Sequence, residues 1–133
     1  YVGSVPAEQV PGELERSDVL LQASKYEPFA ITVAEALACG VPVVGTSEVG
    51  AIEEVDRAVA AEVAPGDVPA IADAIEGAID RLTGDTPAVR ALARAEAARL
   101  FEPGHVCAQI SDALERLVWK VSADRPATPR RRH

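Results

Sequence analysis

Two short apolar runs flank one helix-forming segment, and this order of elements restricts the fold more than any other feature of the sequence. Residues 19–21 and 41–44 are typical of buried parallel strands, and residues 29–39 between them predict a helix that ends at Gly40. A strand, a helix and a second strand at this spacing form a right-handed βαβ unit. Ligands of such sheets bind at the carboxyl ends of the strands, and the loop after Ser24 follows one such end.

The remaining elements add mainly helices to this unit. We expect a short helix near Pro11, a helical turn within residues 49–55, a short strand within residues 58–64, and three helices over residues 67–82, 86–101 and 105–120. Asp67 and Thr86 are the predicted N-caps of the first two of these three helices. All three are amphipathic and need a surface to pack upon. The expected fold class is therefore α/β, with a Rossmann-like doubly wound parallel sheet followed by C-terminal helices.

Length and composition indicate one compact domain outside the membrane. The chain has 133 residues, of which 48% are hydrophobic, yet no apolar run reaches the roughly 18 residues of a membrane span. The first residues also lack the basic and apolar regions of a signal peptide, so we expect a cytoplasmic protein. Cys39 and Cys107 stand far apart without a CxxC or histidine pattern, which indicates neither a metal site nor a disulfide framework.

Charge is distributed unevenly along the chain. Residues 1–121 hold 9 basic and 20 acidic side chains, whereas residues 122–133 hold 4 basic and 1 acidic side chain. The acidic part argues against nucleic acid as a partner, because phosphate contacts supply most of that affinity. The tail at residues 122–133 is rich in proline and arginine and is expected to be disordered. A weak contact with an anionic membrane surface on the cytoplasmic side is the alternative for this tail.

The chain begins with Tyr1 and contains no methionine, so we expect it to be a piece of a longer protein. Its first three residues are typical of the end of a strand whose beginning is absent. We therefore expect a cut within a domain, with residues outside this sequence completing the fold and the site.

The candidate binding site lies at the start of the helix predicted between the two strands. Pro28 offers no side-chain acceptor to the first backbone amides of this helix, so the amides of Phe29, Ala30 and Ile31 are expected to be free. Free amides at the positive end of a helix form a site for phosphate. Glu27 stands beside them, where its carboxylate can accept hydrogen bonds from sugar hydroxyls. This combination indicates a nucleotide sugar.

Thr32 and Glu35 are the only clearly polar residues of this helix, and their spacing of three places them on one face. The helix is otherwise apolar on all sides and is expected to be buried, so that Glu35 needs a hydrogen-bond donor or a ligand. A second interpretation stays open, in which Thr32 caps the helix and Glu35 reaches back to its amide in a capping box.

The run ASKYEPFAITVAEALACGVPVV at residues 23–44 resembles the signature of the GT4-type retaining glycosyltransferases, also described as glycosyl transferases group 1. In that family two glutamates are separated by seven residues, as Glu27 and Glu35 are here, and an alanine-rich helix end, a glycine and Pro-Val-Val follow. The likeness extends over about residues 1–100. It implies that residues 1–121 are a partial C-terminal nucleotide-sugar-binding domain of the GT-B fold.

The resemblance also implies roles for individual residues. Glu27 would contact the transferred sugar and help to align the reacting centre, and Glu35 would hold the ribose hydroxyls of the nucleotide. The diphosphate would be received by groups at the helix start, namely the amides of Phe29, Ala30 and Ile31 and the hydroxyl of Thr32. Members of the family retain the anomeric configuration and need neither a cofactor nor a metal. The implied donor is a UDP-, GDP- or ADP-sugar.

The sequence departs from the family pattern in several places. Ala30 stands where many members have glycine, although its methyl group is expected to fit a helical geometry. Residues 49–53 resemble a loop with paired glycines but contain only Gly50, and no role is assigned to them. The arginine and lysine that neutralise the leaving diphosphate lie upstream of the resembled region, and Lys25 is not at their position. We therefore expect the missing N-terminal domain as a partner, and an inactive isolated fragment.

Two other classes of function share these features. A nucleotide-sugar epimerase of the GT-B fold, or a glycogen-synthase-like enzyme, would share the fold and the phosphate site at a helix start. A non-catalytic nucleotide-sugar-binding module keeps the fold without the chemistry. The upstream residues would distinguish the epimerase, and nucleotide titration would distinguish the module.

Overall fold

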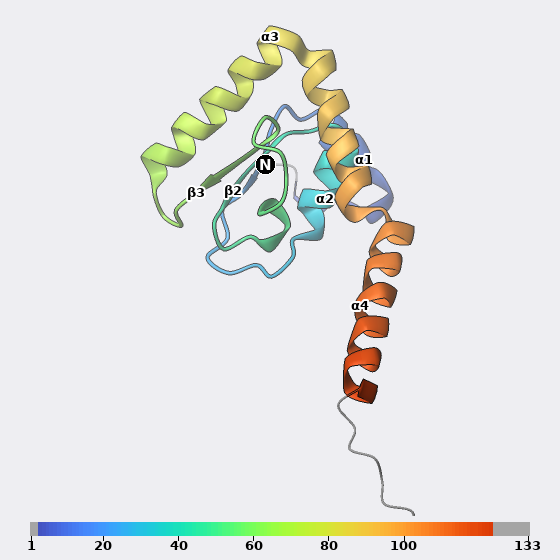
Figure 1. Ribbon diagram of the computed structural model, residues 1–133. Helices are drawn as coiled ribbons and strands as arrows, with labels where there is room; N and C mark the ends of the chain where they lie inside the picture. The colour runs from blue at the N-terminus through green and yellow to red at the C-terminus, as the bar shows by residue number, and fades with distance from the viewer. Residues whose placement is uncertain (1–2, 124–133) are drawn as a thin grey trace, which may run out of the picture. The chain divides into compact units, whose positions relative to one another are not determined.

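Residues 1–101 are built on a three-stranded parallel sheet in the computed structural model, which describes residues 3–123 (Figure 1). The strands are β1 (Leu20–Gln22), β2 (Val43–Thr46) and β3 (Ala60–Val63), and β2 lies between the other two. All four residues of β2 are buried, as its central position requires. The predicted α/β fold with parallel strands and C-terminal helices is confirmed.

The helices follow the predicted order. They are η1 (Ala7–Gln9), α1 (Val10–Glu15), α2 (Ile31–Ala38), η2 (Gly50–Ile52), α3 (Val68–Phe101) and α4 (Pro103–Ala123). The chain divides into two compact units, residues 1–101 and residues 102–133. Because α4 ends at Ala123, its helix continues past the predicted domain end at residue 121. The rest of the predicted tail, and Tyr1 and Val2 of the predicted strand end, lie outside the described residues.

The helix α2 connects β1 to β2 and packs on the sheet with one of its faces. Val33, Ala36 and Leu37 on this face are buried. Gly40 follows the helix with a φ of 79°, a left-handed conformation that glycine adopts without strain. The predicted βαβ unit is therefore present, with a crossover helix slightly shorter than expected.

A sharp bend at Asp85 divides α3 into two halves, which Figure 1 shows in green to yellow and in orange. The φ and ψ of Asp85 are −155° and 78°, and its Oδ1 atom accepts a hydrogen bond from the amide of Ala88 at 3.1 Å. Asp85 is thus the N-cap of the second half. The prediction that Thr86 is the N-cap of this half is wrong, because the hydroxyl of Thr86 donates instead to the carbonyl of Leu82. The predicted cap of the first half, Asp67, is confirmed.

Two arginines of the second half of α3 bind the carboxyl ends of other helices. The Nη2 atom of Arg90 donates to the carbonyl of Ser17, just after α1, at 3.1 Å. The Nη2 atom of Arg94 donates to the carbonyl of Cys39, at the end of α2, at 3.3 Å. Cations stabilise helix ends of this polarity because the last carbonyls lack partners within the helix. The second half of α3 therefore fixes both α1 and α2.

The carboxylate of Glu96, in the same half of α3, fixes the loop after η2. Glu96 as a whole is 7% exposed, and its carboxylate accepts hydrogen bonds from the amide of Asp56 at 2.9 Å and from the guanidinium of Arg99 at 2.7 and 2.9 Å. Arg99 also donates to the carbonyl of Glu54 at 2.8 Å. The hydrogen bonds from Arg99 hold the pKa of Glu96 below its usual value, although burial acts in the opposite direction, and the Asp56 amide lowers it further.

In the second unit, α4 begins where the Oε2 atom of Glu102 accepts a hydrogen bond from the amide of His105 at 2.7 Å. The predicted helix over residues 105–120 is therefore present with an earlier start. Of the helices within residues 3–123, none has both the length and the apolar character that crossing a membrane requires.

We expect Glu96→Gln to lower the free energy of unfolding by about 1–3 kcal/mol near neutral pH, because hydrogen bonds to a charged group are lost. It should also weaken the pH dependence of stability. The pKa of Glu96 is lowered in the folded state, so its carboxylate stabilises the fold fully above the unfolded-state pKa of about 4.3. This contribution is lost as the pH falls through the folded-state pKa. Urea denaturation between about pH 7 and about pH 3 measures both effects.

The matched control for this measurement is Glu76→Gln, which changes an exposed glutamate of α3. The control should leave both stability and its pH dependence nearly unchanged. If Glu96→Gln lost stability on acidification as steeply as the wild type, the interpretation of Glu96 would be wrong.

Candidate functional site

The loop that joins β1 to α2 is hydrogen-bonded to the loop that follows β2. The amide of Glu27 donates to the carbonyl of Glu48 at 2.9 Å, and the amide of Gly50 donates to the carbonyl of Glu27 at 3.1 Å. The amide of Ala51 then donates to the carbonyl of Phe29 at 3.1 Å. These bonds extend the parallel pairing of β1 and β2 beyond the strands. The backbone of the candidate site is therefore fixed at the carboxyl edge of the sheet.

The first residues of this loop are held by side chains at the strand ends. The hydroxyl of Thr46, which is 1% exposed at the end of β2, donates to the carbonyl of Ser24. The side-chain amide of Gln22 donates to the hydroxyl of Ser24 at 2.8 Å. The start of the loop is thus anchored at Ser24 by two hydrogen bonds.

Gly50 is the residue that permits this close approach of the two loops. A Cβ atom at this position would clash with the carbonyl oxygen of Pro28. The sequence shows the glycine but not that Pro28 lies against it in the fold. No role for residues 49–53 could therefore be predicted from spacing alone. The structure identifies Gly50 as a support of the loop that carries Glu27.

We expect Gly50→Ala to lower the free energy of unfolding by about 1–3 kcal/mol, because the added methyl group must displace Pro28. The matched control is Gly12→Ala in α1, where a Cβ atom would meet open space. This control should be neutral or raise stability by up to about 1 kcal/mol, since alanine is the better helix former. Urea denaturation compares the two variants, and equal effects would contradict the role assigned to Gly50.

The side chain of Glu27 turns back onto the amides that follow it. Its Oε1 atom accepts hydrogen bonds from the amide of Ala30 at 3.1 Å and from the amide of Phe29 at 3.4 Å. The prediction that these two amides are free is wrong, because Glu27 itself supplies the acceptor. The amides of Ile31 and Thr32 have no hydrogen-bond acceptor within the described part of the chain. They are the free donors of this helix start.

Ala30 is the N-cap of α2 and has left-handed backbone angles, with a φ of 64° and a ψ of 77°. This conformation costs roughly 1–2 kcal/mol for a residue with a Cβ atom. The expectation that its methyl group lies in a helical geometry is therefore wrong, since the helix begins one residue later. The angles explain physically why glycine suits this position in the resembled family.

Thr32 and Glu35 share one face of α2 as predicted, but this face is exposed. The prediction that Glu35 is buried and needs a partner is wrong, because α2 covers the sheet with its opposite face only. The capping box is not formed either, since the helix begins before Thr32 and no side chain of its N-cap makes a capping hydrogen bond. Glu35 instead presents a solvated carboxylate about one turn after the helix start.

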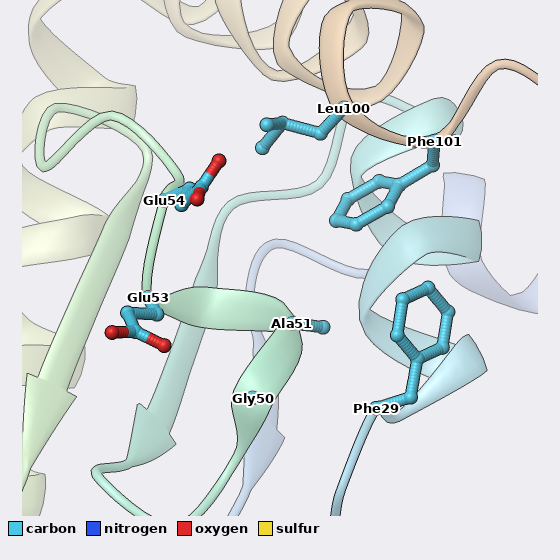
Figure 2. A pocket seen from close by; sticks show the side chains of 7 residues that line it. All are labelled: Phe29, Gly50, Ala51, Glu53, Glu54, Leu100 and Phe101. Carbon is cyan, nitrogen blue, oxygen red and sulfur yellow. The ribbon is translucent and has the colours of Figure 1, made fainter. Parts of the chain in front are cut away.

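A small pocket of about 170 Å³ lies beside this segment, as Figure 2 shows. The rings of Phe29 and Phe101 form one side and meet edge to face, with centroids 5.7 Å apart and planes at 88°. Glu53 and Glu54 come from the opposite side. The end of α3 therefore packs against the loop that carries the candidate site. The sequence pattern contains no signal for this aromatic pair, because its members lie far apart along the chain.

Carboxylates outnumber cations in the segment that carries the site. Lys25 is the only cationic side chain within residues 23–54, which also contain five glutamates, namely Glu27, Glu35, Glu48, Glu53 and Glu54. An anionic ligand at the start of α2 therefore needs positive charge from outside this segment. Across the described residues, no group of three or more His, Cys, Asp or Glu side chains is arranged to hold a metal ion.

Comparison with known proteins gives a family match over most of the chain. The family described as glycosyl transferases group 1 matches residues 1–99. A probable transglycosylase of Burkholderia thailandensis is 29% identical over 125 residues, which cover 94% of this chain and 33% of that protein. A glycogen synthase of Mycobacterium tuberculosis is 33% identical over 102 residues, which cover 75% of this chain and 23% of that protein. The chain thus spans a third or less of these relatives.

Solved structures show the same likeness. HepE of Anabaena in complex with UDP matches with a TM-score of 0.69 and 29% identity, over 84% of this chain and 30% of that chain. The same protein in complex with UDP-glucose matches with a TM-score of 0.65 and 29% identity, over 80% of this chain and 30% of that chain. A sucrose-phosphate synthase of Thermosynechococcus elongatus matches with a TM-score of 0.64 and 28% identity, over 90% of this chain and 30% of that chain.

Proposed function

Because the chain belongs to the glycosyl transferases group 1 family, we propose that it is the donor-binding part of a retaining glycosyltransferase of the GT4 type. The full enzyme transfers the glycosyl group of a nucleoside diphosphate sugar to an acceptor and releases the nucleoside diphosphate. One observation carries the proposal: the amides of Ile31 and Thr32 have no acceptor within the described residues, at the carboxyl edge of a parallel sheet. Ligands of such α/β sheets bind at this edge.

The diphosphate of the donor binds at the start of α2. The aligned peptide dipoles of the helix place about half a positive charge there, and free amides can donate to phosphate oxygens. The exposed hydroxyl of Thr32 lies in the first turn and offers a further donor. The amides of Phe29 and Ala30 join this site once the carboxylate of Glu27 has left them.

Glu35 holds the ribose of the nucleotide. Its carboxylate is exposed on the same face of α2 as Thr32, about one turn farther from the diphosphate. A solvated carboxylate that has no hydrogen-bond partner among residues 3–123 can accept hydrogen bonds from two neighbouring hydroxyls. Hydrogen bonds of this charge-assisted kind contribute about 1.5–3 kcal/mol each.

Glu27 contacts the sugar that is transferred and acts at the reacting centre. Its backbone is fixed by hydrogen bonds to Glu48 and Gly50, so the position of its Cα atom is defined before the donor arrives. Its side chain is partly exposed and can rotate from the helix-start amides toward a bound sugar. Pre-organised groups of this kind lower the barrier of a reaction because no backbone has to be ordered during it.

The N-terminal domain of the same protein completes the active site. Charge placed against the departing diphosphate supplies most of the stabilisation of a transition state of this kind. Residues 23–54 provide only Lys25 as a cation. We therefore assign the neutralising cations and the acceptor site to the N-terminal domain, and the isolated 133-residue chain should be inactive. Turnover by this chain alone would contradict that assignment.

Isothermal titration of the full-length protein with UDP, GDP and ADP tests the donor site. HepE has been solved with UDP and with UDP-glucose, so UDP is the first nucleotide to try. We expect one of the three nucleotides to bind and the corresponding nucleotide sugar to be consumed when an acceptor is present. If none of the three bound, the donor site would be wrong and a module without this chemistry would be favoured.

Glu35→Ala in the full-length protein tests the ribose contact. We expect it to weaken nucleotide binding by about tenfold or more, which corresponds to at least about 1.4 kcal/mol of lost hydrogen bonding. The matched control is Glu76→Ala, which removes an exposed helical glutamate of α3. The control should bind the nucleotide as the wild type does. Unchanged affinity in Glu35→Ala would show that the carboxylate has no part in binding.

A further inference from the structure

We propose that Glu27 makes the site prefer the sugar-bearing donor over the bare nucleoside diphosphate, because its carboxylate competes with the diphosphate for the same amides. The inference rests on the proposed function, since it concerns the site at the start of α2. It adds a specificity role to a residue that the proposed function places beside the sugar.

The carboxylate of Glu27 lies where the phosphate of a donor is proposed to bind. One oxygen, Oε1, accepts hydrogen bonds from two successive amides, those of Phe29 and Ala30. These two amides lie just before α2, and the left-handed turn at Ala30 separates them from the free amides of Ile31 and Thr32, which begin the helix. Glu27 therefore occupies the two amides that immediately precede α2, and it leaves the first two amides of the helix free.

A diphosphate and the Glu27 carboxylate cannot use the amides of Phe29 and Ala30 together. Both groups are anionic acceptors, and each amide has one hydrogen to donate. Lys25 is the only cation within residues 23–54 that could reduce their repulsion. The carboxylate must therefore leave the amides when a diphosphate binds across the whole helix start.

The displacement is confined to the side chain of Glu27. Its amide and carbonyl are hydrogen-bonded to Glu48 and Gly50, and Gly50 lies against Pro28. The backbone of the loop consequently cannot follow the carboxylate without breaking these bonds. Rotation about the side-chain bonds moves the carboxylate away from the helix start.

The two ligands differ in what they offer to the displaced carboxylate. A nucleotide sugar brings hydroxyl groups that donate hydrogen bonds to it and replace the lost amides. A bare nucleoside diphosphate has no transferred sugar, and its ribose hydroxyls are assigned to Glu35, so the displaced carboxylate is hydrated only by water beside a second anion. Glu27 therefore weakens binding of the nucleoside diphosphate, which is the product, more than binding of the donor.

Titration of the full-length wild type and of its Glu27→Ala variant with UDP and UDP-glucose tests this inference. If the protein prefers another base, the nucleoside diphosphate and the nucleotide sugar of that base replace them. We expect the variant to bind the bare nucleoside diphosphate about five- to tenfold more tightly than the wild type, while the preference for the sugar-bearing donor falls about tenfold or more. Glu48→Ala is the matched control. It removes an exposed carboxylate from the neighbouring loop. The carbonyl of residue 48, which accepts the hydrogen bond from the amide of Glu27, stays in place.

The outcomes separate the inference from the function on which it rests. If Glu27→Ala bound the nucleoside diphosphate no more tightly than Glu48→Ala, the competition would be absent and the inference overturned. If the wild type bound no nucleotide, the proposed function would fail, and this inference with it. If circular dichroism showed that Glu27→Ala does not fold, Glu27→Gln compared with Glu48→Gln would replace it, with a smaller gain in affinity expected because the amide oxygen still accepts.

Discussion

The parallel pairing of two loops beyond the ends of β1 and β2 is the constraint on which the candidate site depends. Hydrogen bonds join Glu27 to Glu48 and Gly50, and a side chain at position 50 would break the contact with Pro28. Sheets of this kind bind ligands where their strands end, because backbone groups there are no longer used by the ladder. Here the loops continue the ladder for a few residues, which leaves the start of α2 as the place where donors remain free.

The second half of α3 supports this arrangement from the side. Its arginines bind the carboxyl ends of α1 and α2, its buried Glu96 fixes the loop after η2, and Phe101 packs on Phe29. All of these contacts depend on the bend at Asp85, which turns the second half back toward α2. A helix without this bend would leave the site loops without lateral support, so the bend connects the fold to the proposed function.

The electrostatic character of the site explains why Glu27 is central to the proposals. The helix start attracts anions, while the surrounding segment is rich in carboxylates and contains one lysine. The carboxylate of Glu27 accepts hydrogen bonds from the two amides that precede α2. Glu27 therefore holds the turn before α2, and we propose that it also contacts the transferred sugar and disfavours an anion that arrives without one.

The sequence by itself determined the α/β class, the βαβ unit, the order of the helices and the resemblance to glycosyl transferases group 1, all of which are confirmed. These features follow from local patterns of apolar residues, glycines and prolines, which act over a few positions. Tertiary structure decided what lies beside each site residue. The exposure of Glu35, the left-handed angles of Ala30, the fit of Gly50 against Pro28 and the Phe29–Phe101 pair depend on contacts between distant segments. Local spacing contains no information about such contacts, because packing brings the segments together only in the folded chain.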